Sequence, residues 1–133
     1  MLAGDVGAAG YSVANAPAEA NLGCGLIVVA DCVNPVAESR EAWRHVAVRT
    51  RSRFVEVEIV CSDPREHRRR VEGRTSDVDG LVPPTWQTVQ DRTYEFWEGP
   101  HLIIDTAQVD PDQAVAAVEA HINAPPLGAV RRT

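Results

Sequence analysis

Three apolar runs along the chain are each followed by Asn or Asp, then proline, and then a segment with helical spacing. The runs span residues 26–31, 54–61 and 102–105, and the pairs that follow them are Asn34-Pro35, Asp63-Pro64 and Asp110-Pro111. Asn and Asp are favoured at the N-cap of a helix, and proline is favoured at the first helical position. The pattern therefore predicts three strands, each leading into a helix.

The spacing of apolar residues predicts where the helices lie. Helical patterns cover residues 10–22, 36–50, 64–73, 85–97 and 111–122. In 36–50 the apolar stripe contains Trp43, Val46 and Ala47, which leaves Arg40 on the outer face. Pro17 falls inside 10–22, and a proline costs roughly 3 kcal/mol in a helix interior because it removes an N–H donor. We therefore expect a break or kink at Pro17.

Strands that alternate with helices indicate βαβ units and a mostly parallel sheet, which makes the fold class α/β. Residues 26–30 are continuously apolar up to Asp31, as in a strand buried on both faces. A length of 133 residues corresponds to one domain. We place this domain at residues 1–123, with a flexible tail over residues 124–133.

Charge and composition exclude several classes of partner. The formal net charge is −6, and all 13 basic residues are arginine, so binding to nucleic acid or to an anionic membrane is not expected. No apolar run approaches the roughly 18–20 residues of a membrane span. Three cysteines without a CxxC pair are typical of reduced residues in a cytoplasmic protein. The histidines show no metal-ligand spacing, so no metal site is predicted within the chain.

The end of the first apolar run is the first candidate for chemistry. Ligands of open α/β sheets bind at the carboxyl ends of the strands, where Asp31 and Asn34 would lie. A carboxylate in that place can hold Mg²⁺ through water or orient a hydroxyl nucleophile. The alternative is an Asp that only caps the following turn.

A cluster of arginines forms the second candidate. Arg70 and Arg74 are four residues apart and would share a helix face, and Arg92 follows the polar loop after that helix. Guanidinium groups bind phosphate bidentately and stay charged at every working pH, so a lid over residues 73–92 could close on a phosphorylated ligand. The alternative is a solvated face paired with neighbouring glutamates. At the third strand, the loop that begins with Thr106 is placed to contact a nucleotide base.

These segments together resemble the later two-thirds of small P-loop kinases. The resemblance covers about residues 10–122 and rests on VVADCVNP, DP-x-E-H-RRR-V-E-x-R, PPTWQTVQDRTYEFW and LIIDT. The most similar group is the ATP-binding predicted kinases of the AAA family, relatives of polynucleotide kinase and zeta-toxin-type kinases. The resemblance implies a three-layer parallel sheet and phosphoryl transfer from ATP, with Mg²⁺, to a small hydroxyl acceptor.

Roles follow from the resemblance residue by residue. Asp31 matches the acidic residue near the Mg²⁺ and acceptor site, and Asn34 matches the polar residue of the following turn. Arg70 and Arg74 match lid arginines that bind ATP phosphates and stabilise charge during transfer. Arg92 matches a second arginine beyond the lid, and Thr106 begins the loop near the adenine.

The chain departs from the family at the phosphate-binding loop. It has no G-x-x-x-x-G-K-[ST] motif and contains no lysine, so the backbone cradle, the lysine and the Mg²⁺-binding hydroxyl of that loop are absent from these residues. The family's central first strand is missing as well. The resemblance thus implies an incomplete sheet of three strands whose exposed edges could pair with a second copy of the chain.

Three functions stay open at this point. The chain is a kinase-like ATP-binding protein with impaired transfer, or a non-catalytic partner-binding or oligomerising module built on a kinase shell. The third possibility is an unrelated small α/β protein whose arginines only decorate the surface.

Overall fold

The computed structural model describes residues 7–125 of the chain, and the side chains from residue 13 onward. The described chain is mixed α/β and divides into two compact units. Unit 1 comprises Met1–Phe54 and Arg92–Glu98, and unit 2 comprises Val55–Asp91 and Gly99–Thr133. The single domain expected over residues 1–123 stays a prediction. The tail expected at residues 124–133 lies mostly outside the described residues, which end at 125.

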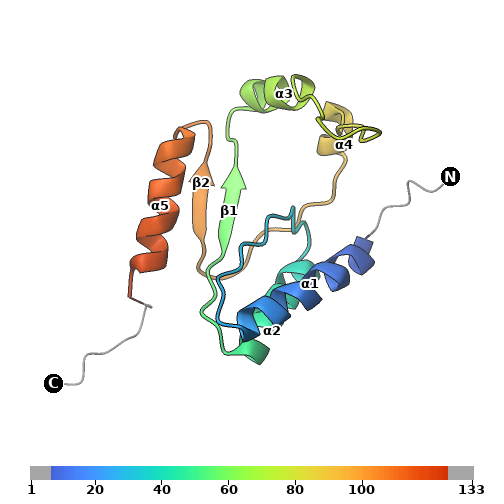
Figure 1. Cartoon of the computed structure of the whole chain (residues 1–133). Helices are drawn as coiled ribbons and strands as arrows, with labels where there is room; N and C mark the ends of the chain where they lie inside the picture. Colours follow the sequence, from blue (N-terminus) through green and yellow to red (C-terminus); the bar gives the residue numbers. More distant parts are fainter. Residues whose placement is uncertain (1–6, 126–133) are drawn as a thin grey trace. The chain divides into compact units, whose positions relative to one another are not determined.

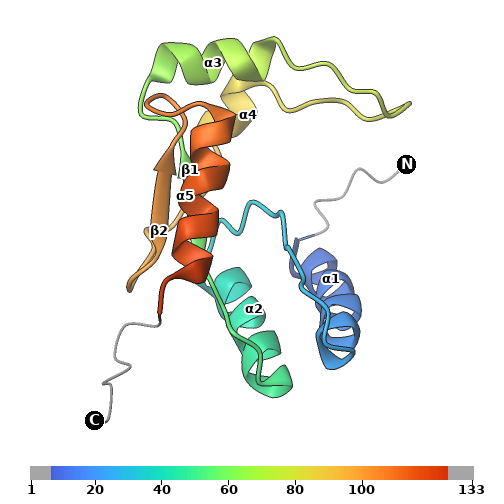
Figure 2. The ribbon, with the colours of Figure 1, turned by 60° about the vertical axis from the view of Figure 1, so that its left-hand side comes forward.

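Unit 1 is built on two helices, α1 (Gly7–Gly23) and α2 (Ala37–Thr50), which lie side by side in Figure 2. Ala18 of α1 packs with Trp43 and Val46 of α2, and Val46 is 2% exposed. A break at Pro17 is wrong, because α1 continues through this residue to Gly23, and a kink there stays a prediction. One turn later, the Asn21 side chain donates to the Pro17 carbonyl oxygen (2.7 Å).

The strand expected at residues 26–31 is also wrong. This segment has no regular secondary structure and pairs with no strand among the described residues, and only its Val28 packs against the α1–α2 core. Its neighbours Ile27 and Val29 are 94% and 87% exposed. The apolar run predicted a strand buried on both faces, but a strand needs a neighbouring ladder to satisfy its backbone groups. The described sheet has two strands instead of the expected three.

The start of α2 differs from the expectation as well. Asn34 does not cap the helix, because its φ of +47° places it in the left-handed region and α2 begins three residues later, after Val36. Val36 has no side chain that can accept a hydrogen bond from the first turn. The Ala37 N–H instead donates to Oε2 of Glu95 (2.7 Å), 58 residues further along the chain.

Unit 2 contains the sheet and three helices. Strands β1 (Val57–Val60) and β2 (Leu102–Asp105) run parallel, with Val57 opposite Leu102 and Val60 opposite Asp105. Helix α5 (Pro111–Asn123) lies alongside β2, and α3 (Pro64–Glu72) follows at the end to which the strand arrows point in Figure 1. Among the described residues of this unit, the buried apolar side chains are Ile104 and Val71, at 3% and 5% exposure.

The helices of unit 2 begin where the sequence predicts them. Asp63 caps α3 by accepting from the backbone N–H groups of Arg65 and Glu66. Asp110 caps α5 in a complete capping box, in which the Gln113 side chain accepts from the Asp110 N–H (2.9 Å). The helical pattern at 85–97 yields only the short helix α4 (Trp86–Gln90), and residues 92–98 belong to unit 1.

Candidate functional site

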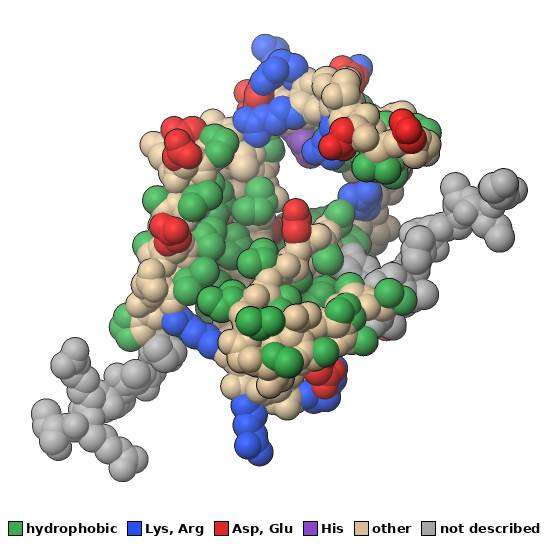
Figure 3. All heavy atoms as spheres, viewed as in Figure 1, with side chains coloured by type: hydrophobic (Ala, Val, Ile, Leu, Met, Phe, Trp, Pro, Cys, Tyr) green, Lys and Arg blue, Asp and Glu red, His purple; other side chains and the backbone are tan. Residues whose placement is uncertain are grey.

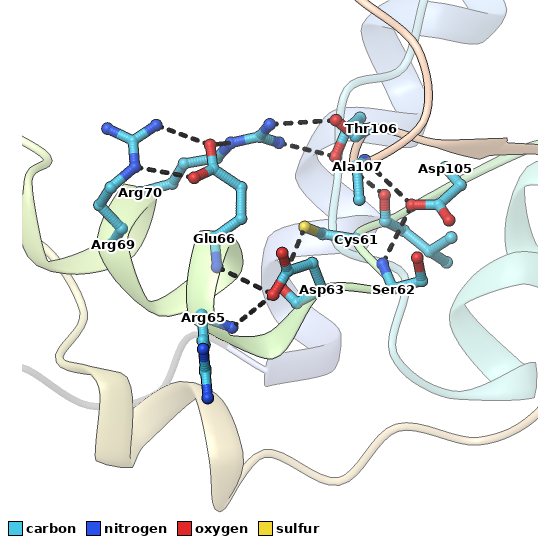
Figure 4. A network of polar contacts seen from close by, with 11 residues as sticks. Cys61, Ser62, Asp63, Arg65, Glu66, Arg69, Arg70, Asp105, Thr106 and Ala107 are labelled. Atoms are coloured by element: carbon cyan, nitrogen blue, oxygen red, sulfur yellow. Dashed lines mark hydrogen bonds and ion pairs between the residues drawn. The ribbon is translucent and has the colours of Figure 1, made fainter.

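The carboxyl ends of β1 and β2 carry a polar network that joins the two strands to α3 (Figure 4). The Asp105 carboxylate accepts from the backbone N–H groups of Ser62 and Ala107, each at 3.0 Å. Hydrogen bonds from Ser62, and then from the Ala107 amide, lower the pKa of Asp105 below its usual value. The last residue of β2 therefore stays ionised and holds the loops that follow both strands.

Arg70 reaches from α3 to the end of β2. Its Nη1 donates to Oγ1 of Thr106 (2.8 Å), and its Nη2 donates to the Thr106 carbonyl oxygen (3.0 Å). The Thr106 hydroxyl in turn donates to the Val60 carbonyl oxygen (2.9 Å). Two of the residues expected from the sequence, Arg70 and Thr106, are thus in direct contact. Their expected roles in binding ATP stay a prediction.

Glu66 bridges two arginines on the same helix. Its Oε1 accepts from Arg69 Nη2 (2.6 Å) and from Arg70 Nε (2.7 Å), while its Oε2 accepts from Arg69 Nε (2.7 Å). Hydrogen bonds from Arg69, then Arg70, lower the pKa of Glu66 to about 2. Arginine and acidic side chains are interspersed over α3 in the space-filling view (Figure 3). The face is therefore ion-paired and only partly cationic.

Arg74 does not share a helix face with Arg70, contrary to the sequence expectation. Helix α3 ends at Glu72, and Gly73 forms its C-cap, so Arg74 lies beyond the helix. Its side chain is exposed and makes no polar contact with the described residues. A glycine has low helix propensity, which explains why the helix ends before Arg74.

The loop expected as a lid is anchored at its two ends. His67 of α3 and Trp86 of α4 pack edge to face, with ring centroids 5.1 Å apart. Between them, the described loop exposes Val78, Leu81 and Val82, with Val82 at 84%. The closing motion of this lid stays a prediction.

The remaining expected residues lie in unit 1. Asp31 is exposed, and Arg92 begins the segment that returns to this unit. Oδ1 of Asn34 accepts from the Trp43 indole N–H (3.1 Å). Asn34 therefore has a structural partner, and the expected site residues are divided between the two units. The gathering of Asp31 with Arg70 and Arg74 in one pocket stays a prediction.

Sequence reasoning placed Arg40 on the outer face of its helix, and this is wrong. Arg40 is 4% exposed and donates to the carbonyl oxygens of four residues, and its guanidinium lies 4.8 Å from the centroid of the Trp97 ring. The four acceptors belong to Asn34, Pro35, Glu95 and Phe96. A signal was present, because Arg40 lies three residues before Trp43 and seven before Ala47, on the buried stripe.

His101 is the second residue that sequence reasoning missed. Its Nε2 lies 2.9 Å from Oε2 of Glu58, and its Nδ1 lies 2.9 Å from the Gly99 carbonyl oxygen. Both partners can accept a hydrogen bond, so the protonated ring can donate to both at once. The Gly99 carbonyl, and then Glu58, raise the pKa of His101 against the opposing effect of burial. The Glu58 carboxylate is thus in direct contact with this histidine.

No group of three or more His, Cys, Asp or Glu side chains in the described part lies close enough together to hold a metal ion. Within the same residues, no helix is both long enough and apolar enough to cross a membrane.

Comparison with known proteins gives one informative similarity. The chain is 28% identical over 122 residues to a guanylate kinase of Rhodospirillum rubrum, an alignment that covers 92% of this chain and 52% of the relative. The chain thus spans about half the length of this curated relative. No family model matches the chain, and no solved structure matches it. The similarity supports a relationship to P-loop kinases, at the level of a nucleotide-kinase-like ancestry.

Proposed function

We propose that this chain is an ATP-binding, kinase-like protein whose reaction is phosphoryl transfer from ATP to a small acceptor, with Arg70 as a phosphate-binding residue. The main support is the position of Arg70, which reaches the carboxyl ends of two parallel strands and contacts Thr106. Ligands of parallel α/β sheets bind at that end. The similarity to a guanylate kinase points to the same class of reaction.

The chemistry of the donors fits a phosphate. The 133 residues contain no lysine, so arginines are the permanently charged side chains that this chain offers to ATP. Arg69 and Arg70 are 73% and 41% exposed, which leaves both accessible to a ligand. When bound, ATP with Mg²⁺ would supply the transferable phosphoryl group and neutralise part of its charge. Arg70 would orient the phosphates against the end of β2.

The finer assignments are proposals as well. We propose that the exposed Asp31 orients the acceptor, and that Asn34 contributes by fixing the loop in which Asp31 lies. Arg74 and Arg92 would add charge to the phosphates from the lid. The proposed family is the polynucleotide-kinase and zeta-toxin-like kinases, in a cytoplasmic setting. The name of the relative makes guanylate the first acceptor to test, beside small hydroxyl compounds.

The experiment is titration of the full chain with ATP and Mg²⁺ by calorimetry. We expect binding at about millimolar affinity or tighter, and about tenfold weaker binding for Arg70→Ala, because charge-assisted hydrogen bonds are lost. Arg68→Ala is the matched control, since it removes the same charge from α3, and among the described residues Arg68 pairs with Glu72 alone (2.8 Å). Absence of binding at millimolar ATP, or equal loss in both variants, would contradict the proposal.

A second candidate function is a non-catalytic module that binds a partner or a second copy. The observation in its favour is exposed apolar surface, with Ile27 at 94% and Val29 at 87% exposure. Each described strand also has only one neighbour, which leaves backbone groups on both edges. Light scattering across protein concentrations tests this function, and Ile27→Glu should dissociate any oligomer. A monomer at every concentration would exclude self-association.

A further inference from the structure

Glu66 stands at a position where its side chain has two possible partners. It is the third residue after the N-cap Asp63, and in a capping box this residue reaches back to the N-cap N–H. Gln113 does so in α5, where its side chain accepts from the Asp110 N–H (2.9 Å). In α3 the Asp63 N–H meets no acceptor among residues 7–125, because Glu66 points toward the arginines instead.

The arginine-bound arrangement of Glu66 copies the way a phosphate would bind. Both carboxylate oxygens contact the guanidinium of Arg69, at 2.6 and 2.7 Å, and one of them also contacts Arg70 at 2.7 Å (Figure 4). Planar guanidinium groups bind carboxylate and phosphate in the same bidentate manner. The remaining contacts of Arg70 are neutral oxygens of Thr106. Glu66 is thus the anion that this arginine pair holds among the described residues.

We propose that Glu66 is an internal competitor for the phosphate group at Arg69 and Arg70, and that a bound phosphate moves Glu66 to the vacant Asp63 N–H. This inference rests on the proposed function, since it assigns a regulation to the same arginines. Displacement leaves the carboxylate with a hydrogen-bond donor, because the capping box is then completed. The ligand class is a phosphate dianion, which brings more charge to the arginine pair than a single carboxylate.

The test compares two variants that each remove one negative charge from α3. Glu66→Gln frees the arginine pair and can still complete the capping box, as Gln113 does in α5. Glu72→Gln is the matched control, because Glu72 pairs with Arg68 and contacts neither Arg69 nor Arg70. Inorganic phosphate is titrated into the full-length wild-type chain and both variants, and binding is followed by the NMR signals of the arginine side chains.

We expect Glu66→Gln to bind inorganic phosphate about fivefold tighter than wild type, and Glu72→Gln to match wild type, because only the first variant removes the competing ion pairs. In the wild-type chain, phosphate should also slow hydrogen exchange of the Asp63 amide. Equal or weaker binding by Glu66→Gln relative to Glu72→Gln would overturn the inference, as would an Asp63 amide that does not respond.

The two proposals fail in different ways. If wild type binds ATP with Mg²⁺ but Glu66→Gln shows no gain in phosphate affinity over Glu72→Gln, the proposed function stands and the competitor role is wrong. If phosphate binds tighter to Glu66→Gln while no variant binds ATP with Mg²⁺, the competitor role stands and the nucleotide function is wrong. If phosphate binds to neither wild type nor Glu66→Gln, the competitor role is wrong.

Discussion

The two units begin their helices in opposite ways. In unit 2, Asp63 and Asp110 cap α3 and α5 from the residues directly before them. In unit 1, the residue before α2 is Val36, and the first turn is capped by Glu95 from 58 residues away. Arg40 holds the same distant segment through the carbonyl oxygens of Glu95 and Phe96. The helices of unit 2 are therefore capped by neighbouring residues, whereas the start of α2 is capped by a segment that is distant in the sequence.

The arginines of the two units differ in the same sense. Arg40 is buried and binds neutral backbone oxygens, so its role is to hold the fold. Arg69 and Arg70 are exposed and bind a carboxylate, so an anion from solution can compete for them. Burial and the charge of the acceptor separate a structural arginine from one available to a ligand. Spacing along the chain puts Arg40 on the buried stripe of α2, but it does not show which oxygens the guanidinium binds.

Replacing Arg40 should give the largest loss of stability. The substitution tests whether unit 1 depends on residues 92–98. Arg40→Ala removes a nearly buried guanidinium and leaves carbonyl oxygens of four residues without this donor, so we expect a loss of about 3 kcal/mol or more in the free energy of unfolding. Chemical denaturation of the full chain measures it. Arg49→Ala is the control on the same helix, since Arg49 forms an exposed pair with Glu19 and should change stability far less. Equal losses of stability in both variants would contradict the structural role of Arg40.

Disrupting the His101–Glu58 pair of unit 2 should give the next largest loss of stability. His101→Ala removes a donor from a nearly buried carboxylate, and we expect a loss of about 1–3 kcal/mol at pH 6. Because the pKa of His101 is raised in the folded chain, this stabilisation is fully present below its ordinary value of 6.5 and is lost as pH rises through the raised pKa. Thermal unfolding between pH 5 and pH 9 measures the slope. A His101→Ala variant with the same pH dependence as wild type would contradict the role of this histidine.

Removing a helix cap should give the smallest loss of stability. It tests directly whether the distant cap of α2 and the local cap of α5 contribute equally. Glu95→Ala and Asp110→Ala each remove one side-chain cap, and we expect each to cost about 1 kcal/mol. Hydrogen exchange should then accelerate in the first turn of α2 for Glu95→Ala and in the first turn of α5 for Asp110→Ala. If Glu95→Ala leaves α2 unchanged, the distant cap contributes nothing to this helix.

The sequence determined the elements whose signals are local. The Asp-Pro pairs placed the starts of α3 and α5, and the apolar runs placed β1 and β2. Each of these features depends on residues within a few positions of one another, because caps and strand alternation act over one turn or one pleat. Thr106 was likewise expected at the end of the last strand and Arg70 on the helix after the second, and the fold brings the two side chains into contact.

The tertiary structure alone decided the features that join distant residues. The apolar run at 26–31 has the composition of a buried strand, yet no described strand lies beside it, and a ladder requires a partner that composition does not reveal. Asn34 receives the Trp43 indole instead of capping a helix, and Arg40 turns inward because carbonyl oxygens from residues 95 and 96 reach it. Such contacts depend on which distant segments lie next to each other in the fold. The hydrophobic and polar pattern along the chain does not show this.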